Sequence, residues 1–213
     1  MSWYWHRVAL LLEQAHQEPI SVDLPGDDAN ASLDDYADIA DRAIGNRSNV
    51  ILVAHSLGGF TALLVCARST VRRLIFVNAM IPQPGETAGA WWGNTGAPQA
   101  RVAAAHLGGY SAEFDLKTYF LHDIPDAVLR DGPAPREQAE AIFQHACGFQ
   151  HWPACPIHVI ASAGDRFFPL DFQRRVARER LGLDVEVVPG GHLVALSHPA
   201  ELVDRLLRFE REG

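Results

Sequence analysis

Residues 49–59 of the chain read Asn-Val-Ile-Leu-Val-Ala-His-Ser-Leu-Gly-Gly. The run from Val50 to Ala54 is apolar throughout and rich in β-branched residues, which is typical of a strand in a parallel sheet covered on both faces. A second apolar stretch begins at Leu57 and continues to about Arg68, and it has the length of a helix. The segment therefore predicts a strand, a sharp turn at Ser56 and a helix.

The rest of the chain alternates extended and helical patterns in the same way. Such alternation predicts an α/β fold with a mainly parallel sheet flanked by helices. A length of 213 residues suits a single domain with one sizeable core. Ser32 is a suitable N-cap for one of the helices. We expect strands at residues 19–24, 49–54, 74–77, 156–161 and 185–188, and helices at residues 5–15, 33–44, 57–68, 170–180 and 199–210.

The segment 82–153 breaks this alternation. It contains several prolines and glycines, the pair Trp91-Trp92 and short helical pieces, including one from Arg136 to His145. A segment this long between consecutive strands usually has a function of its own. We expect a helical insertion that forms a cap, or lid, over the site.

Composition excludes several classes of partner. The formal net charge is −8, and no cluster of Lys and Arg lies near aromatic residues, which argues against a nucleic-acid ligand. The three cysteines form an odd count without metal-ligand spacing, which favours a reducing compartment. No apolar run approaches the roughly 18–20 residues that cross a bilayer. We expect a cytoplasmic protein with no metal, nucleic acid or membrane partner, and its oligomeric state stays open.

Ser56 occupies the position of a nucleophile elbow, where a strand-to-helix turn lifts a serine hydroxyl clear of the sheet. The tight turn favours small residues two places on either side of the serine, and Ala54 and Gly58 meet that requirement. The helix that begins at Leu57 directs backbone N–H groups towards the serine. The Leu57 N–H is therefore the expected oxyanion-hole donor.

A serine hydroxyl needs a general base, and ten histidines compete for this role. His192 follows the strand at 185–188 through two glycines, and catalytic groups gather at the carboxyl ends of parallel strands. His55 is expected to point away from Ser56 and to support the turn. His158 lies within a strand, and His198 is the reserve candidate.

The acid that orients the base should come from another strand end, between serine and histidine in chain order. Asp165 follows the strand at 156–161 and meets this condition. Alternatively, Asp165 is only a turn residue after Gly164. In that case Asp171 begins a helix and Asp123 belongs to the cap.

The motifs at residues 54–59, 164–169 and 190–193 resemble those of bacterial α/β-hydrolases of the esterase and hydroxynitrile-lyase-like superfamily. They read Ala-His-Ser-Leu-Gly-Gly, Gly-Asp-Arg-Phe-Phe-Pro and Gly-Gly-His-Leu, and the resemblance extends to residues 2–5 and 22–26. It therefore covers essentially the whole chain. The resemblance implies a catalytic triad of Ser56, Asp165 and His192, a cap over the site and no cofactor.

The chain departs from this superfamily at its start. Members normally begin with further strands and a His-Gly loop, which donates the second oxyanion N–H and stands just before the tryptophan-rich segment. The last of these strands lies between the counterparts of residues 20–23 and 50–54, so we expect a gap at the centre of the sheet. Either the chain is an N-terminally shortened product, or residues 20–23 pair directly with residues 50–54. We expect this 213-residue form to be weak or inactive beside a version extended upstream.

The expected function is a serine hydrolase that cleaves a small-molecule carboxylic ester through an acyl-enzyme. Trp91, Trp92, Tyr119 and Phe167 either line the substrate pocket or belong to the core. One alternative is cleavage of cyanohydrins by the same triad, which would require a lysine near the site, and Lys117 is the sole lysine. The other is a catalytically weak protein that binds a ligand with the same fold.

Overall fold

The computed structural model describes residues 1–212. Its centre is a four-stranded sheet in which each strand lies beside the next one along the chain. All three pairings are parallel, with Ala54 opposite Phe76 and Phe76 opposite Val159. The strands are β1 (Val50–His55), β2 (Val71–Val77), β3 (Ile157–Ser162) and β4 (Glu186–Val188). The predicted α/β fold with a parallel sheet is confirmed.

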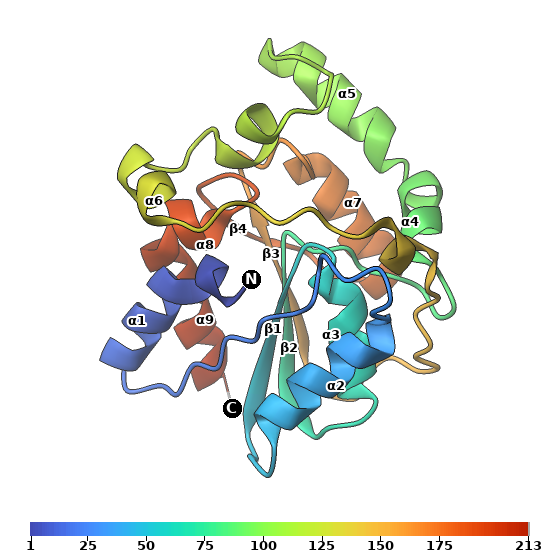
Figure 1. The fold of residues 1–213 in the computed structure, drawn as a ribbon, viewed down its shortest axis with the longest axis vertical. Coiled ribbons are helices and arrows are strands. Elements are labelled where there is room, and N and C mark those ends of the chain that lie inside the picture. Colours follow the sequence, from blue (N-terminus) through green and yellow to red (C-terminus); the bar gives the residue numbers. More distant parts are fainter. Residues whose placement is uncertain (213) are drawn as a thin grey trace.

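Helices cover both faces of this sheet (Figure 1). Leu74 and Phe76 of β2 pack on one face, and Ile75 and Val77 pack on the other. All four side chains are fully buried, which explains why the strand is apolar without alternation. The helices on the first face are α2 (Leu33–Ile44), α3 (Gly58–Cys66) and α7 (Leu170–Leu181). Those on the second are α1 (His6–Gln14), α8 (Val194–Ser197) and α9 (Pro199–Arg211), with the short turn η1 (Ser2–Trp5) before α1.

The helix predicted at residues 33–44 is found with the same bounds. Ser32 and Asp35 form a capping box, in which the Ser32 hydroxyl accepts from the Asp35 N–H at 3.1 Å and Asp35 accepts from the Ser32 N–H at 2.8 Å. The Ser32 hydroxyl also donates to Asp35 Oδ2 at 2.6 Å, and this bond and the one from the Ser32 N–H hold the pKa of the Asp35 carboxyl below its usual value. The cap explains why the sequence defines the start of this helix so well.

The segment 82–153, hereafter the cap, crosses the carboxyl ends of the strands (Figure 1). The prediction of a helix at residues 136–145 is wrong, because only a 3₁₀ turn forms there. The Ala139 N–H and the Gln138 side chain both donate to the Gly26 carbonyl at 2.7 Å and hold the chain against the loop after residue 23. The cap contains α4 (Ala88–Thr95), α5 (Ala97–Gly108), the π-helical turn η2 (Lys117–Leu121), α6 (Asp126–Asp131) and the 3₁₀ turn η3 (Glu140–Gln144).

The strand expected at residues 19–24 does not form, and β1 is the edge of the sheet. Asp23 instead accepts hydrogen bonds from the Ser2 N–H at 2.6 Å and from the Ser2 hydroxyl at 3.1 Å, so this segment is attached to the N-terminal turn. A groove of about 730 Å³ separates residues 16–22 and α1 from β1. Direct pairing of residues 20–23 with residues 50–54 is therefore wrong, and the groove lies beside the edge strand β1 rather than between two strands at the centre of the sheet.

Candidate active site

Ser56 lies at the turn between the end of β1 and the start of α3. Its φ of 52° falls in the left-handed region, which costs about 1–3 kcal/mol for a residue with a side chain. The surrounding backbone stabilises this conformation, because the N–H groups of Met80 and Gly59 donate to the Ser56 carbonyl at 2.9 and 3.2 Å. The turn presents the hydroxyl at the carboxyl ends of the strands.

Gly59 is the small residue that this turn requires. A Cβ on Gly59 would lie 1.9 Å from the Met80 carbonyl oxygen, whereas one on Gly58 would have nothing within 4 Å. The expectation that the turn needs a small residue at position 58 is therefore wrong. The reason is that the loop after β2 crosses the first turn of α3 one residue further along. Ala54 is buried, as expected for its side of the turn.

The structure brings Ser56, His192 and Asp165 together from the ends of three strands. His192 Nε2 lies 3.1 Å from Ser56 Oγ, and His192 Nδ1 lies 2.9 Å from Asp165 Oδ2. His192 and Asp165 are buried. Because a carboxylate only accepts, Nδ1 carries the proton and Nε2 has a lone pair for the serine hydroxyl. The arrangement can remove a proton from Ser56.

Asp165 is both a turn residue and the partner of His192. Its Oδ1 accepts from the N–H groups of Phe167 and Phe168, each at 2.8 Å, and its Oδ2 also accepts from Gln173 Nε2 at 3.2 Å. These donors fix the carboxylate and satisfy its negative charge. Asp171, the alternative acid, lies in the first turn of α7 and forms an exposed ion pair with Arg174.

Two side chains hold the backbone of His192 from the side of the sheet. His55 Nε2 lies 2.8 Å from the His192 carbonyl oxygen, so His55 donates with its Nε2 proton. Asn78 Nδ2 donates to the carbonyls of His192 and Gly191 at 3.0 and 3.2 Å, and to Ser162 Oγ at 2.8 Å. Sequence reasoning missed Asn78, although it follows β2 directly and lies at a strand end, the same signal that selected the other site residues.

His55 stays neutral in this environment. Desolvation, followed by the charge that His192 can carry, lowers the pKa of His55 well below its usual value. A second cation beside His192 would oppose protonation of the His192 ring, and the neutral His55 ring does not. Of the other histidines considered, His158 stacks on Phe209, and His198 Nδ1 lies 3.1 Å from Ser197 Oγ.

Three phenylalanine rings surround the imidazole of His192. The Phe120 ring stacks on it at a centroid distance of 4.9 Å and an angle of 26°. The Phe167 and Phe168 rings lie edge-to-face with the imidazole, at centroid distances of 5.0 and 5.2 Å. An apolar surrounding of this kind excludes water and strengthens the electrostatic interactions of the site. Sequence reasoning selected Phe167 and missed the other two.

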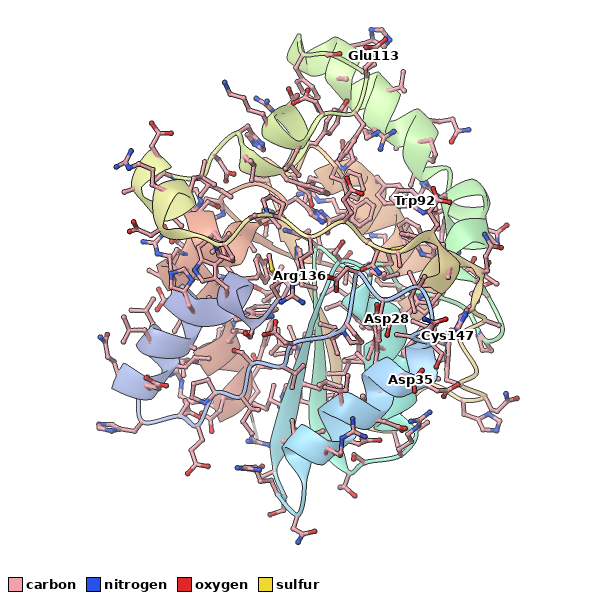
Figure 2. All side chains as sticks on the ribbon, in the orientation of Figure 1. Asp28, Asp35, Trp92, Glu113, Arg136 and Cys147 are labelled. Carbon is pink, nitrogen blue, oxygen red and sulfur yellow. The ribbon has the colours of Figure 1, made fainter. Side chains whose placement is uncertain are left out.

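The four residues predicted to line a pocket occupy different positions. Phe167 contacts His192, and Trp92 of α4, which is labelled in Figure 2, packs against Phe167 with their ring centroids 5.5 Å apart. Trp91 and Tyr119 are fully buried. Trp91 Nε1 donates to the Ile81 carbonyl at 3.1 Å, and the Tyr119 hydroxyl donates to the Ser111 carbonyl at 2.7 Å. The pocket roles stay predictions.

Leu57 occupies the N-cap position of α3, immediately after Ser56. Its N–H has no acceptor within residues 1–212. An unpaired N–H at a helix N-terminus favours an anionic oxygen nearby. Lys117, the residue that cyanohydrin cleavage would require near the site, is exposed at the start of η2.

Comparison with known proteins adds to this geometry. A family model described as "Alpha/beta hydrolase family" matches residues 1–205. Methylesterase 9 of Arabidopsis thaliana is 26% identical to this chain in an alignment 249 residues long. The alignment covers 98% of this chain and 93% of that protein. A pyrethroid hydrolase from Sphingobium faniae JZ-2 superposes with a TM-score of 0.77 at 19% identity, over 100% of this chain and 93% of that one. Polyneuridine aldehyde esterase gives 0.76 at 17% identity, over 98% and 94%.

Proposed function

Because the chain belongs to the alpha/beta hydrolase family, we propose that it hydrolyses a small-molecule carboxylic ester with Ser56 as nucleophile, His192 as base and Asp165 as orienting acid. The observation that carries the proposal is the continuous set of hydrogen bonds from Ser56 Oγ through the His192 ring to Asp165. A serine hydroxyl in contact with a buried imidazole, itself oriented by a carboxylate, is the arrangement that acyl transfer requires.

In the first half of the reaction, His192 Nε2 takes the Ser56 proton as Oγ attacks the ester carbonyl carbon. The carbonyl oxygen becomes an anion, and the Leu57 N–H donates to it at the start of α3. Asp165 stabilises the imidazolium that forms. The imidazolium then protonates the leaving alcohol, and an acyl group remains on Ser56.

In the second half, His192 takes a proton from water, which attacks the acyl carbonyl. The acid product leaves as the imidazolium returns the proton to Ser56 Oγ. Phe120, Phe167 and Phe168 enclose the ring during both steps. His55 and Asn78 hold its backbone, so the base keeps its position between the serine and the acid.

Ester cleavage has more support than the alternatives. The similar proteins are named a methylesterase, a pyrethroid hydrolase and an esterase, which agrees with a carboxylic ester as substrate. Cyanohydrin cleavage would place a cation near the site, but Lys117 is exposed and forms no hydrogen bond or ion pair with Ser56, Asp165 or His192.

The proposal is tested by turnover of p-nitrophenyl butyrate with the purified chain, Ser56→Ala and the control Ser48→Ala. Ser48 is exposed and lies outside the site. Loss of a triad nucleophile reduces kcat by about 10⁴-fold or more. We expect this loss in Ser56→Ala and wild-type turnover in Ser48→Ala. Turnover by Ser56→Ala equal to that of the folded wild type would contradict the proposal, whereas a folded wild type without any turnover would favour ligand binding without catalysis.

A further inference from the structure

The cap touches the loop that carries His192 at two places only a few residues apart. The Phe120 ring stacks on the His192 ring, and three residues later Asp123 Oδ2 accepts a hydrogen bond from the Gly191 N–H at 2.5 Å. Gly191 directly precedes His192 in the chain. The carboxylate therefore binds the peptide unit next to the one that supports the imidazole.

The Asp123 carboxylate is largely buried and has few partners that compensate for its loss of water. Its side chain is only 18% exposed, and its Oδ1 is buried without a hydrogen-bond partner in residues 1–212. The Nδ1 atom of His198 lies 3.8 Å from Oδ2, which is beyond hydrogen-bond distance. A largely buried carboxylate is unfavourable unless its hydrogen bonds compensate. Within the described chain, the hydrogen bond that Asp123 accepts comes from the Gly191 N–H, in the loop 189–192 that carries His192 and is hereafter called the base loop.

The fit between the cap and this loop is close. A Cβ on Gly191 would lie 2.7 Å from Asp123 Oδ1 and 2.7 Å from His122 Cε1. A side chain at position 191 would therefore displace the Asp123 or His122 side chain from its present contact with the loop. Pro189-Gly190-Gly191 would otherwise be a flexible connection to the base.

We propose that Asp123 is a positioning residue, which fixes the Gly191 N–H from the cap and so holds His192 in line between Ser56 and Asp165. The sheet side holds the same segment by the opposite group, because Asn78 and His55 bind the His192 carbonyl. The base loop is thus bound on its N–H by the cap and on its carbonyl by the sheet. This role rests on the proposed ester hydrolysis and adds the cap to the assembly of the base.

The test compares Asp123→Ala, Asp123→Asn and the control Asp131→Ala with p-nitrophenyl butyrate. The asparagine keeps an oxygen that accepts from Gly191, and Asp131 is an exposed carboxylate at the end of α6. Misplacement of a catalytic group by about 1 Å lowers the rate by up to about 100-fold. We expect kcat of Asp123→Ala to fall by about tenfold or more with KM within about twofold. Asp123→Asn should keep most of the activity, and Asp131→Ala all of it.

A second variant reports on the same contact if Asp123→Ala does not fold. Gly191→Ala places its Cβ against the Asp123 carboxylate and should lower kcat in the same way. The proton NMR resonance of His192 Nδ1–H, bonded to Asp165, should lie at low field in wild type and in Asp123→Asn, and should broaden in Asp123→Ala and Gly191→Ala. This resonance does not depend on turnover, so it tests the positioning even where ester hydrolysis fails. Wild-type kcat and an unchanged resonance in Asp123→Ala would overturn the inference.

Discussion

The side-chain amide of Asn78 lies 3.0 Å from the carbonyl oxygen of His192, and this hydrogen bond joins the residue after β2 to the loop after β4. The same amide donates to Ser162 at the end of β3, and its oxygen accepts from the Ser162 N–H at 2.8 Å. Asn78 is fully buried, with a φ of 44° that asparagine tolerates better than most residues. One side chain thus fixes two strand ends relative to the base.

Replacing Asn78 with Asp should impair both stability and turnover. An aspartate still accepts from Ser162, but it has no donor for the two carbonyls of the base loop, and the unmet hydrogen bonds destabilise the fold by about 1–3 kcal/mol. Asn49→Asp is the matched control, since Asn49 also has a positive φ and is exposed. Urea unfolding and ester turnover measure the two effects. Equal behaviour of the two variants would show that the Asn78 amide has no such role.

Alanine at position 59 should disrupt the turn at Ser56, whereas alanine at position 58 should not. The added Cβ would lie 1.9 Å from the Met80 carbonyl in Gly59→Ala and would meet nothing within 4 Å in Gly58→Ala. Gly58 is the first residue of α3, and alanine is favoured over glycine in a helix by up to about 1 kcal/mol. Thermal unfolding should show a large loss of stability for Gly59→Ala alone. A Tm of Gly59→Ala equal to that of wild type would refute the close approach.

A buried ion pair attaches the start of the cap to α7. Glu86 accepts from Arg180 Nη2 at 3.0 Å and from Asn94 at 2.8 Å, and the side chains of Glu86 and Arg180 are 4% and 7% exposed. Burial raises the pKa of Glu86, but the hydrogen bonds from Arg180 and Asn94 outweigh it and hold this pKa below its usual value.

Breaking this pair should therefore be strongly destabilising. Arg180→Met leaves the Glu86 carboxylate buried without its cation, for which the expected loss is about 3–5 kcal/mol. Glu179→Gln is the control, since it breaks an exposed pair with Arg175 on the same helix, which contributes only about 0.3–0.5 kcal/mol. Chemical denaturation of both variants gives the comparison. A loss below about 1 kcal/mol in Arg180→Met would show that the pair is not an important link.

Acid should destabilise the fold below the usual pKa of histidine, about 6.5. Desolvation lowers the pKa of His55 well below that value, and it also lowers the pKa of His122 and of His158. The unfolded chain therefore binds protons that the folded chain does not, and stability falls as the pH drops from about 6.5 towards the folded pKa values. Well above pH 6.5 these histidines are neutral in both the folded and the unfolded chain, so they no longer reduce the free energy of unfolding.

His55→Gln should reduce this acid sensitivity. Each proton bound only by the unfolded chain changes the free energy of unfolding by at most about 1.4 kcal/mol per pH unit. The free energy of unfolding, measured in urea from pH 5 to pH 8, should therefore have a shallower slope in His55→Gln. His106→Gln, at an exposed position, is the control. An unchanged slope in His55→Gln would mean that His55 does not supply this proton difference.

The sequence predicted those elements whose signals are local. The helix from Leu33 to Ile44 has its own capping box, and the apolar strands are read from their residues alone. The strand expected at residues 19–24 failed because a strand also needs a partner. The local pattern does not show that Asp23 is attached to Ser2 rather than to β1. The prediction of a helix at residues 136–145 also failed because of contacts distant in sequence. Hydrogen bonds to the Gly26 carbonyl hold that segment against the loop after residue 23.

The candidate site divides in a similar way. Ser56 follows β1 directly, and Asp165 and His192 lie in the loops that follow β3 and β4, so the rule for parallel strand ends selects residues that the structure brings together. Asn78 satisfies the same rule and was overlooked. Phe120 and Asp123 contact His192 and its loop only because of the path that the cap follows, and Gly191 is the 68th residue after Asp123. No local pattern predicts contacts of that kind.

The central claim is that Ser56 Oγ is the nucleophile, activated by His192. Reaction of the folded chain with a fluorophosphonate, followed by peptide mass spectrometry, tests it most directly, because the reagent bonds covalently to an activated serine. We expect one adduct, on the peptide that contains Ser56, no adduct in Ser56→Ala, and much slower labelling in His192→Gln. A folded chain that stays unlabelled, or that is labelled at another serine, would contradict the account.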